Sequence, residues 1–583
     1  MKIKFQYTIA VIIALANLDG AMAQKKDENI GTEVVNVVKP YTPTISDAFK
    51  VKETPVIEDE DNMQKENIEY NIFSFPVAST FTPAKGRAAN VERAKREKLF
   101  NNYATLGAGN YGTVNAELFV TQNLSRNAYV GGMLRHLSSQ GGIDDVVLDD
   151  KYYNTSVDLT YGNRQQGYSW NADLGYQNQV YNWSGLPVEY TVFSDDIIAG
   201  IDEQQTYHTI NVGGNISMKE SIFSDASLQY KRFWDAYDSA ENRFIFKPSF
   251  DVNVMAEKIK LDVIADYVGV TFSENNTITE EQKYSYFNLG AQPSILFQNE
   301  DVSVNLGAGL FYSMGNVNDE SDSKFFVYPQ VKASYKVVGD LMVAYAGAEG
   351  TLKQNSYEEF VSQNPFVAPS LVVAPTDQQY DVYVGLKGKL ASTVAYNIRG
   401  SYMNEDNKAF FLNNTLFSPP ALGDEGFAYG NSFRILYDRL KTISFFGELK
   451  ADFTKSVRAG ISGNYYSYNT DQIEAWNMPE MKVSANLDVN ITEKWTAGTN
   501  IFFVGERKDF INYDSTDPIL DIGRVVTLKS YFDVNAHVGY DYNERLSGFL
   551  RLNNIANQDY QRWVNYQVQG FQFLLGASYK FNF

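Results

Sequence analysis

The last residues of the chain, 571–583, alternate apolar and polar side chains at a period of two. Successive side chains of an extended strand point to opposite faces. One face therefore carries only apolar side chains, namely Phe571, Phe573, Leu575, Ala577, Tyr579, Phe581 and Phe583. A soluble sheet must cover such a face with a second layer, whereas a membrane barrel leaves it against acyl chains and ends it in an aromatic girdle. The segment therefore predicts a membrane-spanning β-strand.

The same alternation recurs from Leu99 onward, which predicts strands with one apolar face throughout this region. Clear examples lie at residues 114–120, 157–161, 168–176, 259–267, 302–312, 481–491 and 532–540. No segment after the N-terminus offers the roughly 20 consecutive apolar residues of a membrane helix. Membrane residence must therefore come from strands. The mean hydropathy of −0.32 is compatible with this, because half of each strand faces a polar lumen.

The connections between the strands alternate in length. Short polar turns are expected at residues 123–127, 163–166, 219–225, 256–258, 298–301, 338–340, 389–392, 454–456, 491–494 and 542–545. Longer acidic or proline-containing stretches separate them, at 141–151, 183–204, 355–377, 417–426 and 505–521. About ten short turns, with a first and a last strand, give about 22 strands. The predicted fold class is all-β: a transmembrane antiparallel β-barrel with short periplasmic turns and long extracellular loops over residues 99–583.

The N-terminus predicts export. Lysines precede an apolar run at residues 8–16, and Ala21 and Ala23 form a cleavage site before Gln24. Residues 1–23 are therefore expected to be a signal peptide that is removed. The chain has no cysteine, which excludes disulfides, a lipid-anchored cysteine and thiolate metal sites. A formal net charge of −20 argues against nucleic acid as a partner, since phosphate binding needs a basic surface.

Residues 24–98 differ from the rest and predict a periplasmic N-terminal extension. Prolines and charge runs such as the acidic stretch 58–61 suit an extended segment or linker. Residues 87–98 are basic and predict a short helix that leads into the first strand. This helix is either a solvated linker or a filling for an acidic lumen.

Two C-terminal features resemble known outer-membrane barrels. The aromatic end with Tyr579, Phe581 and Phe583 is similar to the closing strand that the barrel-assembly machinery reads. The sequence 546–560 resembles the signature near the end of TonB-dependent receptor barrels, with Asn554, Ile555, Asn557 and Tyr560 in the matching places. Residues 476–479, Trp-Asn-Met-Pro, also resemble a recurring strand entry of these barrels. The resemblance covers residues 99–583 and implies an outer-membrane location.

The resemblance stops at the N-terminus. TonB-dependent receptors carry a folded plug between leader and barrel, and residues 24–98 are too few and too rich in proline and charge for one. The chain is therefore expected to lack the plug. A short apolar run is similar to the TonB box that such receptors offer to TonB by strand addition. It consists of Glu33, Val34, Val35, Val37 and Val38, and its alternative is an ordinary extended segment.

Candidate chemistry is sparse. The three histidines, His136, His208 and His537, lie on different expected strands, and no nucleophile, base and orienting group share a face. Acidic loops such as 144–150, 319–322 and 514–521 carry carboxylates but match no calcium loop, so no metal site is predicted. We predict no enzyme activity, no catalytic residue and no cofactor.

Two functions remain open. The barrel transports a solute across the outer membrane, passively or with a partner such as TonB. Alternatively, it is a structural or accessory barrel whose extension docks a periplasmic protein. A surface lipoprotein is a further candidate partner.

Overall fold

The structure, a computed structural model, describes residues 99–189, 191–254, 257–273, 281–418, 425–515 and 522–583. All described residues belong to one compact unit. Two short helices, α2 (Asp195–Gly200) and α3 (Tyr357–Gln363), accompany the strands in this part of the chain. Among the described residues, no helix has the length and apolarity needed to cross a bilayer.

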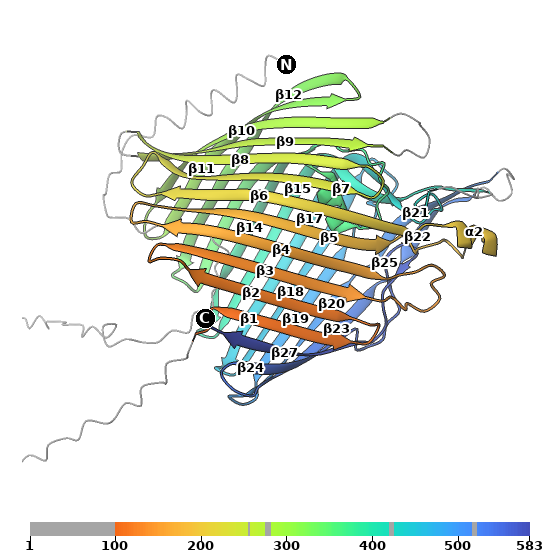
Figure 1. The fold of residues 1–583 in the computed structure, drawn as a ribbon. Coiled ribbons are helices and arrows are strands. Elements are labelled where there is room, and N and C mark those ends of the chain that lie inside the picture. Colours follow the sequence, from red (N-terminus) through yellow and green to blue (C-terminus); the bar gives the residue numbers. More distant parts are fainter. Residues whose placement is uncertain (1–98, 190, 255–256, 274–280, 419–424, 516–521) are drawn as a thin grey trace, which may run out of the picture. The chain divides into compact units, whose positions relative to one another are not determined.

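Twenty-two strands form one sheet (Figure 1). In chain order they are β1 (Asn102–Gly109), β2 (Val114–Asn123), β3 (Ala128–Ser139), β4 (Tyr152–Arg164), β5 (Tyr168–Asn182), β6 (Gln204–Met218), β7 (Phe223–Asp235), β8 (Ala240–Val254), β9 (Glu257–Phe272), β10 (Gln282–Gln298), β11 (Val302–Val317), β12 (Glu320–Val338), β13 (Met342–Lys353), β14 (Thr376–Ala391), β15 (Val394–Asn413), β17 (Phe433–Thr454), β18 (Val457–Thr470), β19 (Met481–Asn490), β20 (Trp495–Val504), β23 (Tyr531–Asp541), β24 (Leu546–Asn553) and β27 (Gln572–Phe581).

The sheet closes on itself. Each strand pairs antiparallel with the next barrel strand, and β27 pairs with β1 from Asn102↔Phe581 to Gly109↔Leu574. In the bilayer every backbone N–H and C=O needs a partner within the protein, and closure removes the two edges that would otherwise lack one. The predicted antiparallel barrel of about 22 strands is therefore confirmed.

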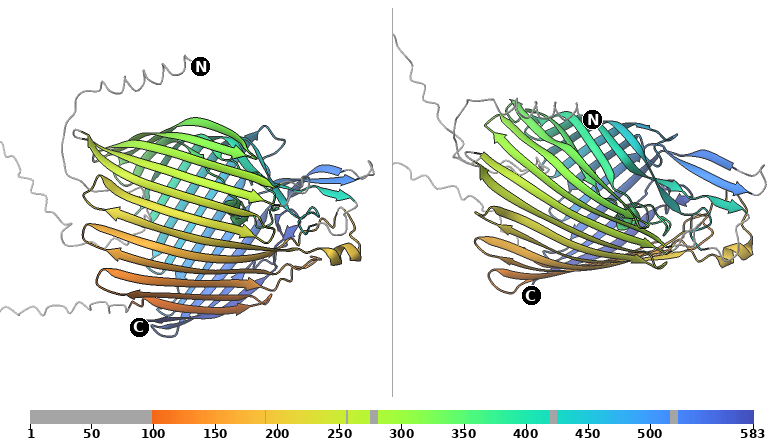
Figure 2. Two further views of the ribbon diagram at one scale, coloured as in Figure 1. Left: turned by 45° about the horizontal axis from the view of Figure 1, so that its top comes forward. Right: turned by 90° about the horizontal axis from the view of Figure 1, so that it is seen from above.

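The two rims of the barrel differ as expected. The ten predicted short turns all join neighbouring strands at one rim, while the longer connections lie at the other (Figure 1). The region 505–521 departs from a simple loop, because it contributes a strand to a small sheet of β16 (Leu416–Ser418), β21 (Arg507–Ser515) and β22 (Ile522–Leu528). This sheet projects beyond the rim that carries the long loops (Figures 1 and 2). A two-stranded sheet of β25 (Gln561–Trp563) and β26 (Tyr566–Gln567) lies in the last extracellular connection.

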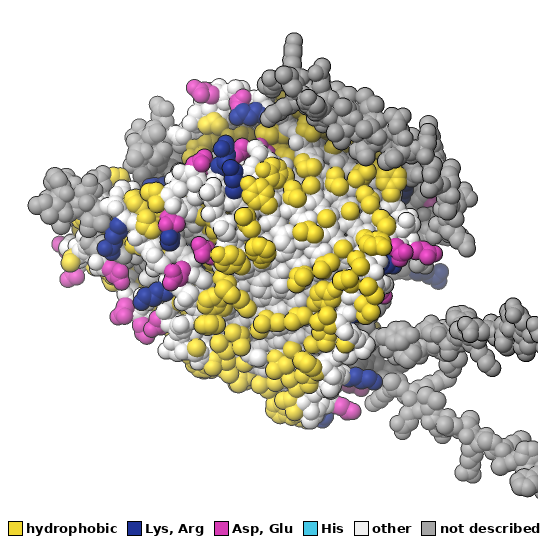
Figure 3. All heavy atoms as spheres, turned by 180° about the vertical axis from the view of Figure 1, so that it is seen from behind, with side chains coloured by type: hydrophobic (Ala, Val, Ile, Leu, Met, Phe, Trp, Pro, Cys, Tyr) yellow, Lys and Arg dark blue, Asp and Glu magenta, His cyan; other side chains and the backbone are white. Residues whose placement is uncertain are grey.

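The outward and inward faces of the barrel wall carry different side chains, because one faces lipid and the other faces the lumen. Outward side chains are apolar and exposed, such as Leu106 at 64% and Leu575 at 63%. Figure 3 shows a broad apolar area on one side of the wall, with many of the charged side chains toward its ends. Inward side chains include ion pairs such as Arg135–Asp158 at 2.7 Å. An apolar belt outside and charges inside are the arrangement of an outer-membrane barrel, and the outer membrane is where this barrel resides.

We predict that the two faces of β4 tolerate a charge very differently. Leu159→Arg places a cation on the outward belt and should destabilise the barrel by about 2–4 kcal/mol, because the guanidinium loses water to lipid. Thr160→Arg, one residue further and facing the lumen near Asp173, should cost much less. Urea midpoints measured in lipid vesicles compare the two variants. Equal losses for both would contradict a lipid-facing Leu159.

Candidate functional site

The connection between β13 and β14, residues 354–375, folds back toward the lumen and is called the inserted loop below (Figure 2, green). It starts and ends at one point of the wall, because Lys353 and Thr376 are paired in register. Within it, Ser356 caps α3 by accepting a hydrogen bond from the Glu359 N–H at 3.2 Å. This short helix buries Tyr357, Phe360 and Val361 against the barrel.

Aromatic side chains of the wall receive the inserted loop. The Tyr357 ring makes edge contacts with Phe233 of β7 and Phe272 of β9, with centroids at 5.1 and 5.0 Å. On the opposite side, Phe360 meets Phe411 of β15 at 6.0 Å. Tyr357 is fully buried. The loop thus connects strands from two different parts of the wall through one apolar core at the extracellular end of the lumen.

Tyr357 is also held by hydrogen bonds to two wall carboxylates. Its hydroxyl donates to Asp235 Oδ2 at 2.7 Å, and its backbone N–H donates to Glu241 Oε2 at 2.5 Å. Burial and the neighbouring Asp235 carboxylate raise the pKa of Tyr357 well above its usual value. The hydroxyl therefore stays protonated and remains a donor at any physiological pH.

Two cations of the wall pair with the acidic residues of α3. Arg243 of β8 donates to Asp266 of β9 at 2.9 and 3.1 Å and to Glu359 at 2.7 Å. Lys231 of β7 pairs with Glu358 at 3.0 Å. Arg243 is buried, so losing both of its carboxylate partners would leave a charge without compensation in a low-dielectric place. These pairs fix the loop to the β7–β9 part of the wall.

Further extracellular segments cover the inserted loop. The Phe366 ring stacks on Tyr566 of β26 with centroids 3.7 Å apart, and the Tyr566 hydroxyl donates to the Asn431 carbonyl at 2.5 Å. Asn431 in turn donates to the carbonyls of Trp183 at 2.7 Å and Gly426 at 2.9 Å. Segments far apart in the sequence thus interlock at the extracellular end of the barrel.

Asp509 of β21 anchors the projecting sheet. Its carboxylate accepts from the backbone N–H groups of Asn413 at 3.1 Å and Phe510 at 2.7 Å, and from the Asn477 amide at 2.8 Å. The residue is completely buried. Burial raises the pKa of Asp509 to about 6, although these three hydrogen bonds oppose the change.

The family-like residues lie together in the turn after β24. Asn554 and Asn557 both have positive φ, +46° and +47°, which asparagine tolerates better than most residues. The Asn554 amide donates to the Gln558 and Gln569 carbonyls, each at 3.1 Å. Asn557 Oδ1 accepts from the Phe571 N–H at 2.6 Å. Ile555 donates its N–H to the Val534 carbonyl, and Tyr560 stacks on Tyr531 at 3.8 Å. These residues hold the loop before β27 against β23.

The other sequence-predicted residues lie elsewhere. Tyr579 and Phe581 are in β27 and Phe583 follows it, while His136, His208 and His537 lie on β3, β6 and β23. The TonB-box-like residues 33–38, the basic stretch 87–98, the signal peptide and the expected absence of a plug fall outside the described residues. Within the described ranges, no three His, Cys, Asp or Glu side chains are grouped to hold a metal ion.

Sequence reasoning assigned residues 355–377 to an extracellular loop and missed that this loop packs against inward-facing residues of the wall. A signal was present, because residues 366–375 read Phe-Val-Ala-Pro-Ser-Leu-Val-Val-Ala-Pro. Such an apolar run is unusual in a solvated loop. Its partners, such as Tyr207 of β6 and Phe433 of β17, are distant in sequence and were not predictable from the local pattern.

Comparison with solved structures finds outer-membrane receptors and transporters. The ferripyoverdine receptor of Pseudomonas aeruginosa matches with a TM-score of 0.62 and 13% identity, over 84% of this chain and 73% of that one. The ferric-catecholate import receptor Fiu of E. coli K12 matches with 0.60 and 11%, over 84% and 82%. The copper transporter OprC matches with 0.60 and 12%, over 84% and 81%. The chain has the barrel fold of TonB-dependent receptors. No family model and no curated protein matches the sequence.

We predict that the Tyr357 hydroxyl stabilises the inserted loop. Tyr357→Phe keeps the ring contacts but leaves the buried Asp235 carboxylate without this donor, which should cost about 1–3 kcal/mol. Hydrogen exchange of residues 354–375 should accelerate, while exchange in β18–β20 stays unchanged. Tyr396→Phe, which removes a hydroxyl at the periplasmic rim, is the matched control. Unaltered exchange of the loop would show that the hydroxyl contributes nothing.

We predict that the projecting sheet becomes less stable as pH rises. The folded-state pKa of Asp509 is raised, so its contribution is complete below about pH 4 and is lost as pH rises through about 6. The pKa of Asp509 is raised by about two units, which corresponds to about 3 kcal/mol of unfolding free energy. Proteolysis of residues 507–528 in the purified barrel should therefore be faster at pH 7 than at pH 4.5, after correction for protease activity. Asp509→Asn should remove this difference, and a sheet that becomes more resistant with rising pH would contradict the assignment.

Proposed function

We propose that this chain is an outer-membrane transport barrel whose extracellular entrance is gated by the inserted loop. The observation that carries the proposal is the way in which the loop is attached. It starts and ends at a single point of the wall, Lys353 and Thr376, and reaches the remaining strands through side-chain packing, hydrogen bonds, ion pairs and one short backbone bridge, between Val367 and Phe433 of β17. These contacts can be broken without disturbing the strand-to-strand pairings that close the barrel.

The lumen below the loop supports passage of a polar solute. Inward charges lie in pairs along the wall, for example Lys332–Glu349 at 2.7 Å and Arg399–Asp381 at 2.5 Å. Partly exposed ion pairs of this kind are expected where water fills the interior. A barrel of this strand number encloses a lumen wide enough to need filling or closing.

The neighbours support transport as the general class. Their names describe siderophore receptors, an iron transporter and a copper transporter. We propose solute transport without naming a substrate, and we propose that the chain is not an enzyme and uses no cofactor. Coupling to TonB through residues Glu33 to Val38 remains part of the proposal, as do assembly by the barrel-assembly machinery through Tyr579, Phe581 and Phe583 and a surface lipoprotein partner.

The test is single-channel conductance in planar bilayers. Because Lys353 and Thr376 are paired, a two-residue Asn-Gly turn can replace residues 354–375 without altering the register. The intact chain should conduct rarely, whereas the loop-replaced chain should form stable aqueous channels. Replacing residues 140–151 between the paired Ser139 and Tyr152 in the same way is the matched control and should leave conductance low. If the loop-replaced chain stays silent even without residues 24–98, transport is excluded.

The interlocked extracellular end favours a second candidate, a structural or accessory barrel. Tyr566, Asn431 and Trp183 join three extracellular segments over the inserted loop. A barrel that never opens would serve as a scaffold and dock a periplasmic protein through residues 24–98. Pull-down of native membranes with and without residues 24–98 identifies such a protein, and a scaffold predicts both a partner that is lost with the extension and a silent barrel.

A further inference from the structure

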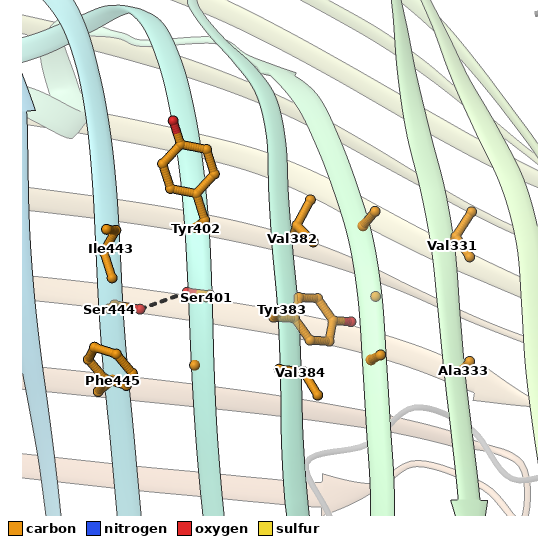
Figure 4. A pocket seen from close by; sticks show the side chains of 14 residues that line it. Val331, Ala333, Val382, Tyr383, Val384, Ser401, Tyr402, Ile443, Ser444 and Phe445 are labelled. Atoms are coloured by element: carbon orange, nitrogen blue, oxygen red, sulfur yellow. Dashed lines mark hydrogen bonds between the residues drawn. The ribbon is translucent and has the colours of Figure 1, made fainter.

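The outer wall carries a groove in a part of the barrel that the proposed function does not use. It has a volume of about 580 Å³ and crosses β12, β13, β14, β15 and β17 (Figure 4). Two neighbouring cross-strand rows of the outward face line it: Val331, Ala348, Val382, Tyr402 and Ile443 in one row, and Ala333, Ala346, Val384, Gly400 and Phe445 in the other. We call this feature the outer groove.

Side-chain size explains why the wall is hollow here. Ala346, Ala348 and Gly400 form a low floor, while Val384 and Phe445 rise beside it with 65% and 60% of their surface exposed. A Cβ added to Gly400 would meet the Phe445 ring at 3.7 Å, an ordinary contact, so the space is open. The polar Ser401 and Ser444 point away from the groove and bond to each other at 2.7 Å (Figure 4). Apart from the Tyr402 hydroxyl, the groove therefore offers apolar contacts at the depth of the hydrocarbon belt.

A cation lies directly above the groove on the same face. Along β17, Arg439, Lys441, Ile443 and Phe445 follow at every second position, so all four side chains point outward. Arg439 is paired with Asp406 at 2.7 Å. Lys441 is flanked in register by Asn404 and Asn469, and among the described residues it has no carboxylate partner. Its side chain lies toward the extracellular rim, where headgroups of the outer leaflet are found.

We propose that the outer groove and Lys441 bind one anionic lipid of the outer leaflet, a phosphorylated multi-acylated glycolipid. An acyl chain lies along Ala346, Ala348 and Gly400, and a phosphate contacts the Lys441 ammonium, which has no carboxylate partner in the part of the chain that the structure describes. Burial of the chain supplies apolar contact, and the lysine supplies attraction to the anionic headgroup. The site is independent of solute passage, because every contact lies on the outside of the wall.

The test measures bound lipid on the intact chain by native mass spectrometry. The chain is purified in detergent and titrated with diphosphoryl lipid A, or with phosphatidylglycerol as a different anionic lipid. Lys441→Gln should lower the apparent affinity for lipid A about five-fold, the usual contribution of one lysine near an anionic surface. Gly400→Leu fills the floor and should lower it at least as much, and Ala346→Leu on a different strand gives a second filling variant if the first folds poorly.

Two matched controls define the expected specificity. Ala172→Leu enlarges an outward alanine on β5, remote from the groove, and Lys455→Gln removes a lysine at the periplasmic turn between β17 and β18. Both should bind lipid A as the unaltered chain does. High salt should weaken the contribution of Lys441 and leave that of Gly400 in place.

Three results would overturn the proposal. Unchanged lipid A binding in the groove and lysine variants would show that the site takes no lipid. Phosphatidylglycerol that binds as tightly as lipid A would show that the groove does not select the glycolipid. A dimer of the purified chain that Gly400→Leu dissociates would show that a second copy of this barrel occupies the groove.

Discussion

The pairing of every backbone amide inside a bilayer is the constraint on which this structure depends. Lipid offers no hydrogen-bond partner, so strands can cross it only when the sheet closes. The β1–β27 pairing satisfies this requirement and leaves the barrel without an open edge. Once closure is imposed, the alternation of side chains follows, because each residue must face either acyl chains or the lumen.

Above the hydrocarbon belt the same chain builds a core of a different kind. There, water surrounds the segments, and the inserted loop gathers Tyr357, Phe360 and Val367 against wall aromatics much as a soluble domain would. Buried charged groups there have partners of two kinds: Arg243 forms ion pairs with Asp266 and Glu359, whereas Asp509 accepts hydrogen bonds from uncharged donors. The barrel is thus held by strand-to-strand backbone bonds, whereas the extracellular end is held mainly by side chains. This difference allows the contacts of the extracellular end to change while the barrel persists.

The sequence predicted the barrel well because lipid imposes a local rule. Alternation at residues 302–312 or 532–540 can be read without knowing which strand lies next to it, and short turns such as 454–456 mark the hairpins. The packing of the inserted loop at the extracellular end follows no local sequence rule. Tyr357 is buried by Phe233 and Phe272, more than eighty positions away, so its environment depends on the finished fold. Asn554 and Asn557 were recognised by resemblance, whereas their positive φ and their hydrogen bonds to the last loop became visible only in three dimensions.

The seam between the first and last strands also bears on how the chain acquires its shape. Thr105 and Ser578 bond across the seam although they stand 473 positions apart, and Gly109 and Gly576 allow the two backbones to approach closely. Every other neighbouring pair of barrel strands can form as soon as its own hairpin exists. The seam can form only when the complete polypeptide is present. Until then the growing sheet exposes two strand edges with unpaired backbone groups. Aggregation during biogenesis therefore competes most strongly with the last folding step, the pairing of the first and last strands. An insertion apparatus that acts as a chaperone is most valuable at that step.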